Sequence, residues 1–237
     1  MPVARQSLLR LCAAVAFGIG GANSASAFEP TSSYVNQDVQ GWTVRVHKSL
    51  LAEEKELGDR ALSILSGRLF ETAQLVPAKP LEQLRRVPIW LEFSNPKTSS
   101  AQYHPSREWL TENDFNPEKT KCVEIANADN FLKEQRRQPC MLIHELAHAY
   151  HERVLTFEEP RIMAAYERAK QAALYDKVLN FAAKDARHYA LTNHKEFFAE
   201  LTECYFGTND FFPFVRPELQ RHDPETFQLL EEIWAAP

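Results

Sequence analysis

The chain has 237 residues, a formal net charge of −5, and a composition that is 44% hydrophobic and 25% charged. This length suits one large domain or two small ones, and it is ample for an apolar core. A disordered chain is excluded, because 15 Phe, 7 Tyr and 4 Trp supply ample surface to bury. Acidic residues outnumber basic ones 32 to 27, so the chain is not expected to bind nucleic acid.

Residues 1–27 have the three parts of a secretory signal peptide. Two arginines are followed by a short apolar run at Leu11–Ile19 and by an Ala-Ser-Ala cleavage site that ends at Ala27. A transmembrane anchor is the alternative, but the apolar run falls short of the about 20 residues that a span requires. We therefore expect a secreted or periplasmic protein, residues 28–237, with no membrane anchor.

Three cysteines remain after this segment, namely Cys122, Cys140 and Cys204. An odd number in a secreted protein predicts one disulfide and one unpaired thiol. Cys122 and Cys140 are nearest in sequence, and a bridge between them would close a loop of about 18 residues, worth about 3 kcal/mol. Cys204 lies in an apolar helical stretch, where it is expected to be a small buried hydrophobe.

The first half of the chain is expected to be mixed in structure. Phe28–Gln40 has no periodicity and is interpreted as an extended leader. Apolar residues then recur every four positions over Leu50–Val76, which predicts one long helix ended by Pro77 and Pro80. Alternation and apolar content predict three short strands: Trp42–His47, Val87–Phe93 and Cys122–Asn127.

One segment of the first half stays open, and the second half is expected to be helical. Ala101–Leu110 is ambiguous, with Tyr103 in a possible edge strand and His104 interpreted as a surface residue. The second half has three expected helices: Arg161–Lys184, Asn193–Phe206 and Pro224–Trp234. Strands followed by helices predict an α+β fold. We expect a single domain, with the sheet in residues 41–155 and a mainly helical part in residues 156–237.

The stretch His144-Glu145-Leu146-Ala147-His148 carries the chemistry. Two histidines four residues apart lie on one face of a helix, so both imidazoles can reach one metal ion. Glu145 lies on the flank of that face, where it can take a proton from water at the metal. Apolar neighbours favour a helix that begins at Pro139. The alternative is a surface helix that carries two histidines by chance.

A catalytic zinc site needs a third protein ligand. Glu196 and Glu200 are one helical turn apart among bulky apolar residues, and buried carboxylates need a partner such as a cation. Glu196 is the favoured ligand, although Asn193 and Glu196 also fit a helix cap. Glu200 is either the ligand instead or the acceptor that orients a ligand imidazole. His151 lies about 10 Å along the helix from His144, too far to join them, so it lines the pocket or is solvated.

The His144-Glu145-x-x-His148 motif, together with Tyr189 and the segment that runs from it to Glu200, resembles the gluzincin metallopeptidases. It is most similar to the family of the anthrax lethal factor catalytic domain. The likeness covers about residues 139–206. It implies a zincin-like fold, in which a small mixed sheet packs on the active-site helix, and Glu145 as general base. Tyr189 would stabilise the oxyanion, with His188 as its backup. The resemblance implies three zinc ligands: His144, His148 and Glu196.

The favoured function is a secreted zinc metallopeptidase that uses one Zn²⁺ to hydrolyse peptide bonds. Its partner would be a peptide or protein substrate, and a monomer is expected. Two alternatives stay open. One is a zinc amidase that acts on cell-wall or glycopeptide substrates, and the other is a non-catalytic module that binds zinc for an interaction.

Overall fold

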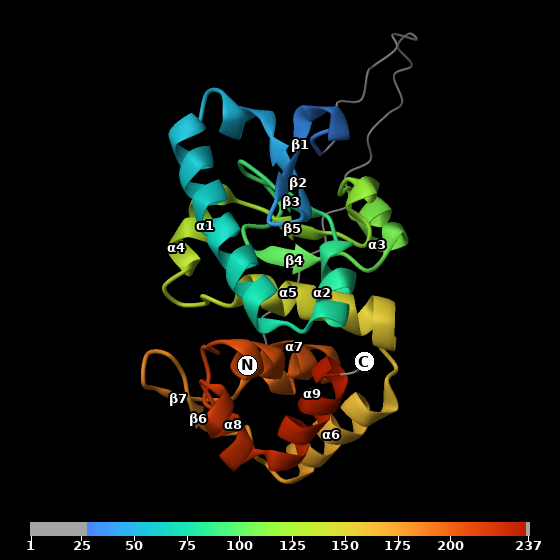
Figure 1. The fold of residues 1–237 in the computed structure, drawn as a ribbon, viewed down its shortest axis with the longest axis vertical. Helices are drawn as coiled ribbons and strands as arrows, with labels where there is room; N and C mark the ends of the chain where they lie inside the picture. Colours follow the sequence, from blue (N-terminus) through green and yellow to red (C-terminus); the bar gives the residue numbers. More distant parts are fainter. Residues whose placement is uncertain (1–27, 236–237) are drawn as a thin grey trace, which may run out of the picture.

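The computed structural model describes residues 28–235, so the predicted signal peptide lies outside the described residues. The described chain has a mixed α+β fold, as the sequence predicts (Figure 1). The sheet and the helix α1 occupy one end of the molecule, and the helices of the last third occupy the other end (Figure 1). Helix α5 runs between the two ends and contacts both the sheet and α7.

The main sheet has five strands in the order β1-β2-β3-β5-β4. Strands β2, β3 and β5 are parallel to one another, whereas β1 and β4 are antiparallel edge strands. Strands β3 and β5 are fully buried, as expected for strands covered on both faces. The strand bounds are β1 (Tyr34–Val39), β2 (Trp42–His47), β3 (Ile89–Leu91), β4 (Ala101–Tyr103) and β5 (Val123–Ile125).

The expectation that Phe28–Gln40 is an extended leader without pairing is wrong for its second half. Tyr34–Val39 is β1, which pairs with β2 in a hairpin. Only Tyr34 of this strand is buried, because an edge strand with one face in solvent has little apolar surface to cover. That exposure explains why the stretch lacks the alternation that marks a strand.

The described residues contain nine α-helices. In α1, Gly58 permits close contact with the preceding turn, since a Cβ there would lie 1.8 Å from the carbonyl oxygen of Leu50. None of the described helices is both long enough and apolar enough to span a membrane. The bounds are α1 (Lys55–Leu75), α2 (Ala78–Arg85), α3 (Arg107–Glu112), α4 (Ala128–Glu134), α5 (Met141–Tyr150), α6 (Pro160–Gln171), α7 (His194–Phe206), α8 (Arg216–His222) and α9 (Pro224–Ala235).

The helix expected over Arg161–Lys184 is wrong in its second half. Helix α6 ends at Gln171, and Ala173 then takes a positive φ of 53°. The chain turns inward there, so that Tyr175 is fully buried and its hydroxyl donates to Asp223 at 3.2 Å. A two-stranded hairpin follows, formed by β6 (Val178–Leu179) and β7 (Asp185–Ala186).

Helix α2 was not expected, because Pro77 and Pro80 suggested a break. Pro77 is the N-cap and Pro80 lies in the first turn, where its missing N–H would have no partner in the helix. The prolines therefore begin a new helix rather than ending all helical structure.

A buried ionic network lies at the sheet. The ammonium group of Lys119 donates to Glu92 and Glu124, each at 2.6 Å. Tyr34 donates to Glu92, and the Nε2 atom of His104 lies 2.6 Å from Glu124. His104 is therefore buried, and its interpretation as a surface residue is wrong. Hydrogen bonds from His104 and Lys119 outweigh the effect of burial and lower the pKa of Glu124 to about 2.

The expected disulfide is not formed. Cys122, Cys140 and Cys204 are free thiols. Cys122 is buried beside Trp90 at the sheet, whereas the Sγ atom of Cys140 accepts the backbone N–H of Thr208, just after α7. Strand β5 and helix α4 separate the two cysteines along the chain and lead to different contacts, so closeness in sequence does not bring them together. Cys204 is fully buried, as expected.

Candidate metal centre

The expected ligand residues come from two helices that pack against each other. His144, Glu145 and His148 lie on α5, and Glu196 lies in the first turn of α7. Asn193 caps α7 by accepting the N–H groups of Lys195 and Glu196, so the predicted cap is confirmed. The cap uses the backbone of Glu196 and leaves its side chain available for the contacts with α5.

Three side-chain atoms of these residues form a nearly equilateral triangle. The Nε2 atoms of His144 and His148 are 3.1 Å apart, and the Oε2 atom of Glu196 lies 3.2 Å from the first and 3.3 Å from the second. Two ligands of a tetrahedral zinc ion, at bond lengths of 2.0–2.1 Å, are separated by about 3.3 Å. The triangle therefore has the dimensions of three corners of a zinc tetrahedron, and these residues form a group that could hold a metal ion.

His144 is oriented by a second carboxylate that the sequence analysis missed. Its Nδ1 atom lies 2.7 Å from Oε1 of Glu203, which is buried on α7. A carboxylate accepts, so Nδ1 carries a proton, and Nε2 is the nitrogen that faces the triangle. Glu203 lies seven residues after Glu196, on the same face of α7. This spacing was the available signal.

The short contacts within the triangle shift the pKa values of His144 and Glu196 in opposite directions. Burial lowers the pKa of His144, but its hydrogen bonds to Glu196 and Glu203 outweigh burial and hold that pKa well above the usual value. Burial raises the pKa of Glu196, but its hydrogen bonds to His144 and His148 outweigh burial and keep that pKa far below the usual value. The centre thus holds an ionised carboxylate beside a proton that a metal ion could replace.

Glu145 is the candidate general base. It is buried, it lines the same cleft as the ligand residues, and its Oε2 atom accepts the backbone N–H of Tyr103 at 2.7 Å. This hydrogen bond joins helix α5 to the edge strand β4. Burial raises the pKa of Glu145, although the neighbouring His144 and His148 act in the opposite direction. A carboxylate with a raised pKa is a better proton acceptor.

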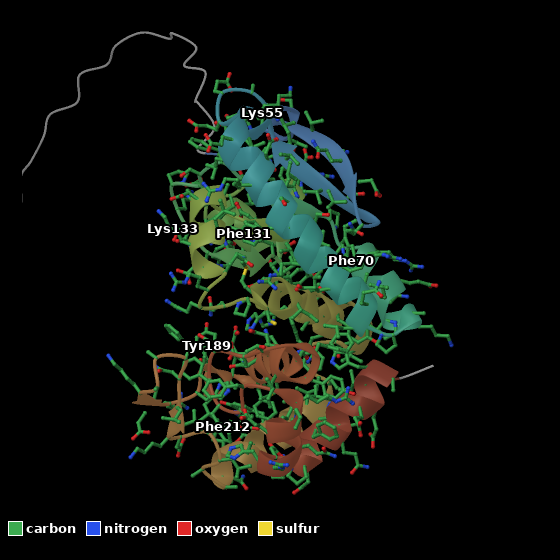
Figure 2. The ribbon with its side chains drawn as sticks, turned by 60° about the vertical axis from the view of Figure 1, so that its left-hand side comes forward. Lys55, Phe70, Phe131, Lys133, Tyr189 and Phe212 are labelled. Carbon is green, nitrogen blue, oxygen red and sulfur yellow. The ribbon has the colours of Figure 1, made fainter. Side chains whose placement is uncertain are left out.

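A cleft of about 820 Å³ opens over these residues. Its walls come from both ends of the molecule, as Phe131 of α4 and Tyr189 of the turn before α7 illustrate (Figure 2). Tyr189 is 49% exposed. Burial and the nearby carboxylate of Glu196 raise its pKa, so its hydroxyl keeps the proton that an oxyanion would accept as a hydrogen bond.

Glu200 is buried behind the triangle. Its Oε1 atom lies 3.4 Å from Nδ1 of His144, which is longer than the 2.7 Å contact made by Glu203. Its Oε2 atom accepts from the side-chain amide of Asn209 at 3.1 Å. The orienting role that the sequence suggested for Glu200 therefore falls mainly to Glu203. Burial and the adjacent Glu203 carboxylate raise the pKa of Glu200 well above its usual value.

Two other histidines do not belong to the centre. His151 is fully buried against Phe157 and Phe198, so the expectation that it lines the pocket or is solvated is wrong. His188 is buried and stacks on Phe211, while its Nδ1 atom accepts the N–H of Ala190. Neither histidine lines the cleft, and burial lowers the pKa of each to about 3. His188 is thus a structural residue, which argues against its backup role.

Comparison of the chain with known protein families, with characterised proteins and with solved structures finds no match. The functional conclusion therefore depends on the geometry and chemistry of the site.

Proposed function

We propose that this protein is a zinc-dependent metallopeptidase that hydrolyses peptide bonds. The observation that carries the proposal is the triangle of His144 Nε2, His148 Nε2 and Glu196 Oε2, whose sides of 3.1–3.3 Å fit a tetrahedral zinc ion. Two histidines and one carboxylate are a donor set of catalytic zinc sites, in which the fourth position stays open. The open cleft above the triangle supports a catalytic rather than a structural site.

The residues around the triangle have the roles that amide hydrolysis requires. When bound, zinc supplies a Lewis acid that acidifies water and polarises a carbonyl group. Glu145 takes the proton of the attacking water and delivers it to the leaving amine. The Tyr189 hydroxyl donates to the developing oxyanion. Glu203 fixes the imidazole of His144 through Nδ1.

Within this proposal the protein is a gluzincin with a zincin-like fold. Support comes from the His144-Glu145-x-x-His148 pattern, from Glu196 on a second helix 48 residues after His148, and from Tyr189 at the cleft. The contact between Glu145 and the edge strand β4 agrees with a small mixed sheet packed on the active-site helix. The pattern of residues 1–27 supports secretion or a periplasmic location.

The test is hydrolysis of a generic peptide library by the zinc-loaded protein and by its Glu145→Gln variant. We expect wild-type protein to cleave peptides, and the variant to bind one equivalent of zinc while losing about 10²- to 10⁴-fold in rate. Wild-type protein that binds zinc but cleaves no peptide would favour the non-catalytic module. Cleavage only of cell-wall or glycopeptide amides would favour the amidase.

A further inference from the structure

The deep end of the cleft is strongly acidic. The cleft lining carries six carboxylates and a single arginine, Arg137, among the described residues. Three of the carboxylates, those of Glu200, Glu203 and Asp210, lie together behind the metal-binding triangle. Each is at most 5% exposed.

One of these carboxylates has an oxygen without a partner. Glu203 is 2% exposed, and its Oε1 atom contacts His144, but its Oε2 atom is buried without a hydrogen bond to any described residue. Leaving such an oxygen unpaired is costly, and burial raises the pKa of Glu203. Glu203 belongs to the cleft lining, so a donor that enters the cleft would lie beside this carboxyl group.

The chemistry of the neighbours favours a cationic organic group over a second metal ion. Among the described residues, the group that contains Glu200 and Glu203 has His144 as its nitrogen ligand, and Nδ1 of this histidine donates to Glu203. A second metal ion would need Nδ1 to release that proton while Nε2 of the same ring binds the first ion. An ammonium or guanidinium group, by contrast, offers several N–H donors to carboxylate oxygens at once.

The rest of the cleft suits a long side chain that ends in such a cation. Met141, Phe181 and Phe211 contribute apolar surface to the same lining. The methylene stem of a lysine or arginine can lie along apolar surface while its charged end reaches a polar group. The acidic group lies directly behind a ligand imidazole, since Oε1 of Glu203 is 2.7 Å from Nδ1 of His144.

We propose that Glu200, Glu203 and Asp210 form a subsite for a cationic group of the substrate, an ammonium or a guanidinium, next to the scissile bond. The inference rests on the proposed function, since it names the substrate class of that site. Arg137 is the positively charged side chain already present in the cleft lining, and the substrate cation would add a second positive charge. It lies near Asp210 but is half exposed, and it lies 3.6 Å from Glu134.

The first test measures binding without catalysis. Metal-free protein is titrated with N-acetylated, fluorescein-labelled hexapeptides that carry Lys, Arg, norleucine or Glu at one position at a time. At one position, we expect Lys or Arg to bind at least about tenfold tighter than norleucine, the scale of one charged hydrogen bond. Asp210→Asn should reduce this ratio to below about threefold, because a hydrogen bond to a neutral amide contributes less than one to a carboxylate. Asp59→Asn, an exposed carboxylate on α1, should keep the wild-type ratio.

The outcomes show whether the cation is a side chain or the terminal ammonium group, and whether the site binds a metal ion instead. Tighter binding of peptides with a free amino terminus than of acetylated ones would identify the cation as the terminal ammonium group. Equal affinity for charged and norleucine peptides at every position, with or without a free amino terminus, would overturn the proposal. So would an unchanged preference in Asp210→Asn. Uptake of two zinc equivalents, with the second lost in Asp210→Asn, would show a metal site instead.

The same peptides, incubated with zinc-loaded protein, distinguish the two proposals. Tight binding of cationic peptides without any cleavage would refute the peptidase function and leave the cationic subsite standing. Cleavage with no preference for Lys, Arg or a free amino terminus would support the peptidase and refute the subsite.

Discussion

Substitution of Glu203 by glutamine tests how the metal centre is held in place. Glutamine keeps the size of the side chain and can still accept from Nδ1 of His144, but it removes the charge from a 2.7 Å hydrogen bond. Hydrogen bonds to charged groups contribute about 1.5–3 kcal/mol, against about 1 kcal/mol for neutral ones. Since about 1.4 kcal/mol corresponds to a factor of ten, zinc affinity should fall by about 10-fold.

Competition titration against a zinc-binding dye measures this loss. Circular dichroism of the metal-free protein checks that the variant folds. Glu200→Gln is the matched comparison, because Glu200 lies 3.4 Å from the same nitrogen and should affect zinc affinity less. Glu71→Gln, an exposed carboxylate on α1, should have no effect. The reasoning is refuted when Glu203→Gln binds zinc as tightly as wild type while Glu200→Gln does not.

Three further predictions follow from the described contacts. Tyr189→Phe should lower kcat by about 10²-fold or more without loss of zinc, since one oxyanion donor is removed; peptide hydrolysis and metal analysis measure both quantities. Zinc affinity should fall with decreasing pH, because the raised pKa of His144 means that zinc must displace a proton; a pH-independent titration would contradict this. The pKa of Glu124, lowered from 4.5 to about 2, stabilises the fold above pH 4.5, and this contribution is lost as the pH falls toward 2. Glu124→Gln should remove about 3 kcal/mol at neutral pH and flatten that acid dependence in urea unfolding, whereas a wild-type profile would refute the assignment.

The parts of the fold that the sequence predicted well have a strong local signal. Helices α1, α7 and α9 follow from apolar periodicity, and Asn193 marks the start of α7. The wrong predictions concern segments whose secondary structure depends on tertiary contacts. Helix α6 ends near Ala173 with no glycine or proline to mark the turn, because burial of Tyr175 draws the chain inward. Strand β1 exposes most of its side chains and so shows no alternation.

The candidate site shows the same division. His144 and His148 are predictable because a spacing of four residues places both on one helical face. Glu196 lies on a different helix, and it was favoured over Glu200 before the family resemblance implied the same choice. Glu203 had a usable signal in its spacing from Glu196. The burial of His151 depends on helices distant in sequence, which no local pattern reports.

The most direct test of the metal centre is zinc stoichiometry, measured on purified protein by mass spectrometry under native conditions. We expect one zinc ion per wild-type chain. Loss of that ion, or a drop in affinity of about 10²-fold or more, is expected when His144, His148 or Glu196 is replaced by alanine. Asp59→Ala, remote from the site, should retain full zinc binding. Undiminished zinc binding by Glu196→Ala would contradict the proposed ligand set.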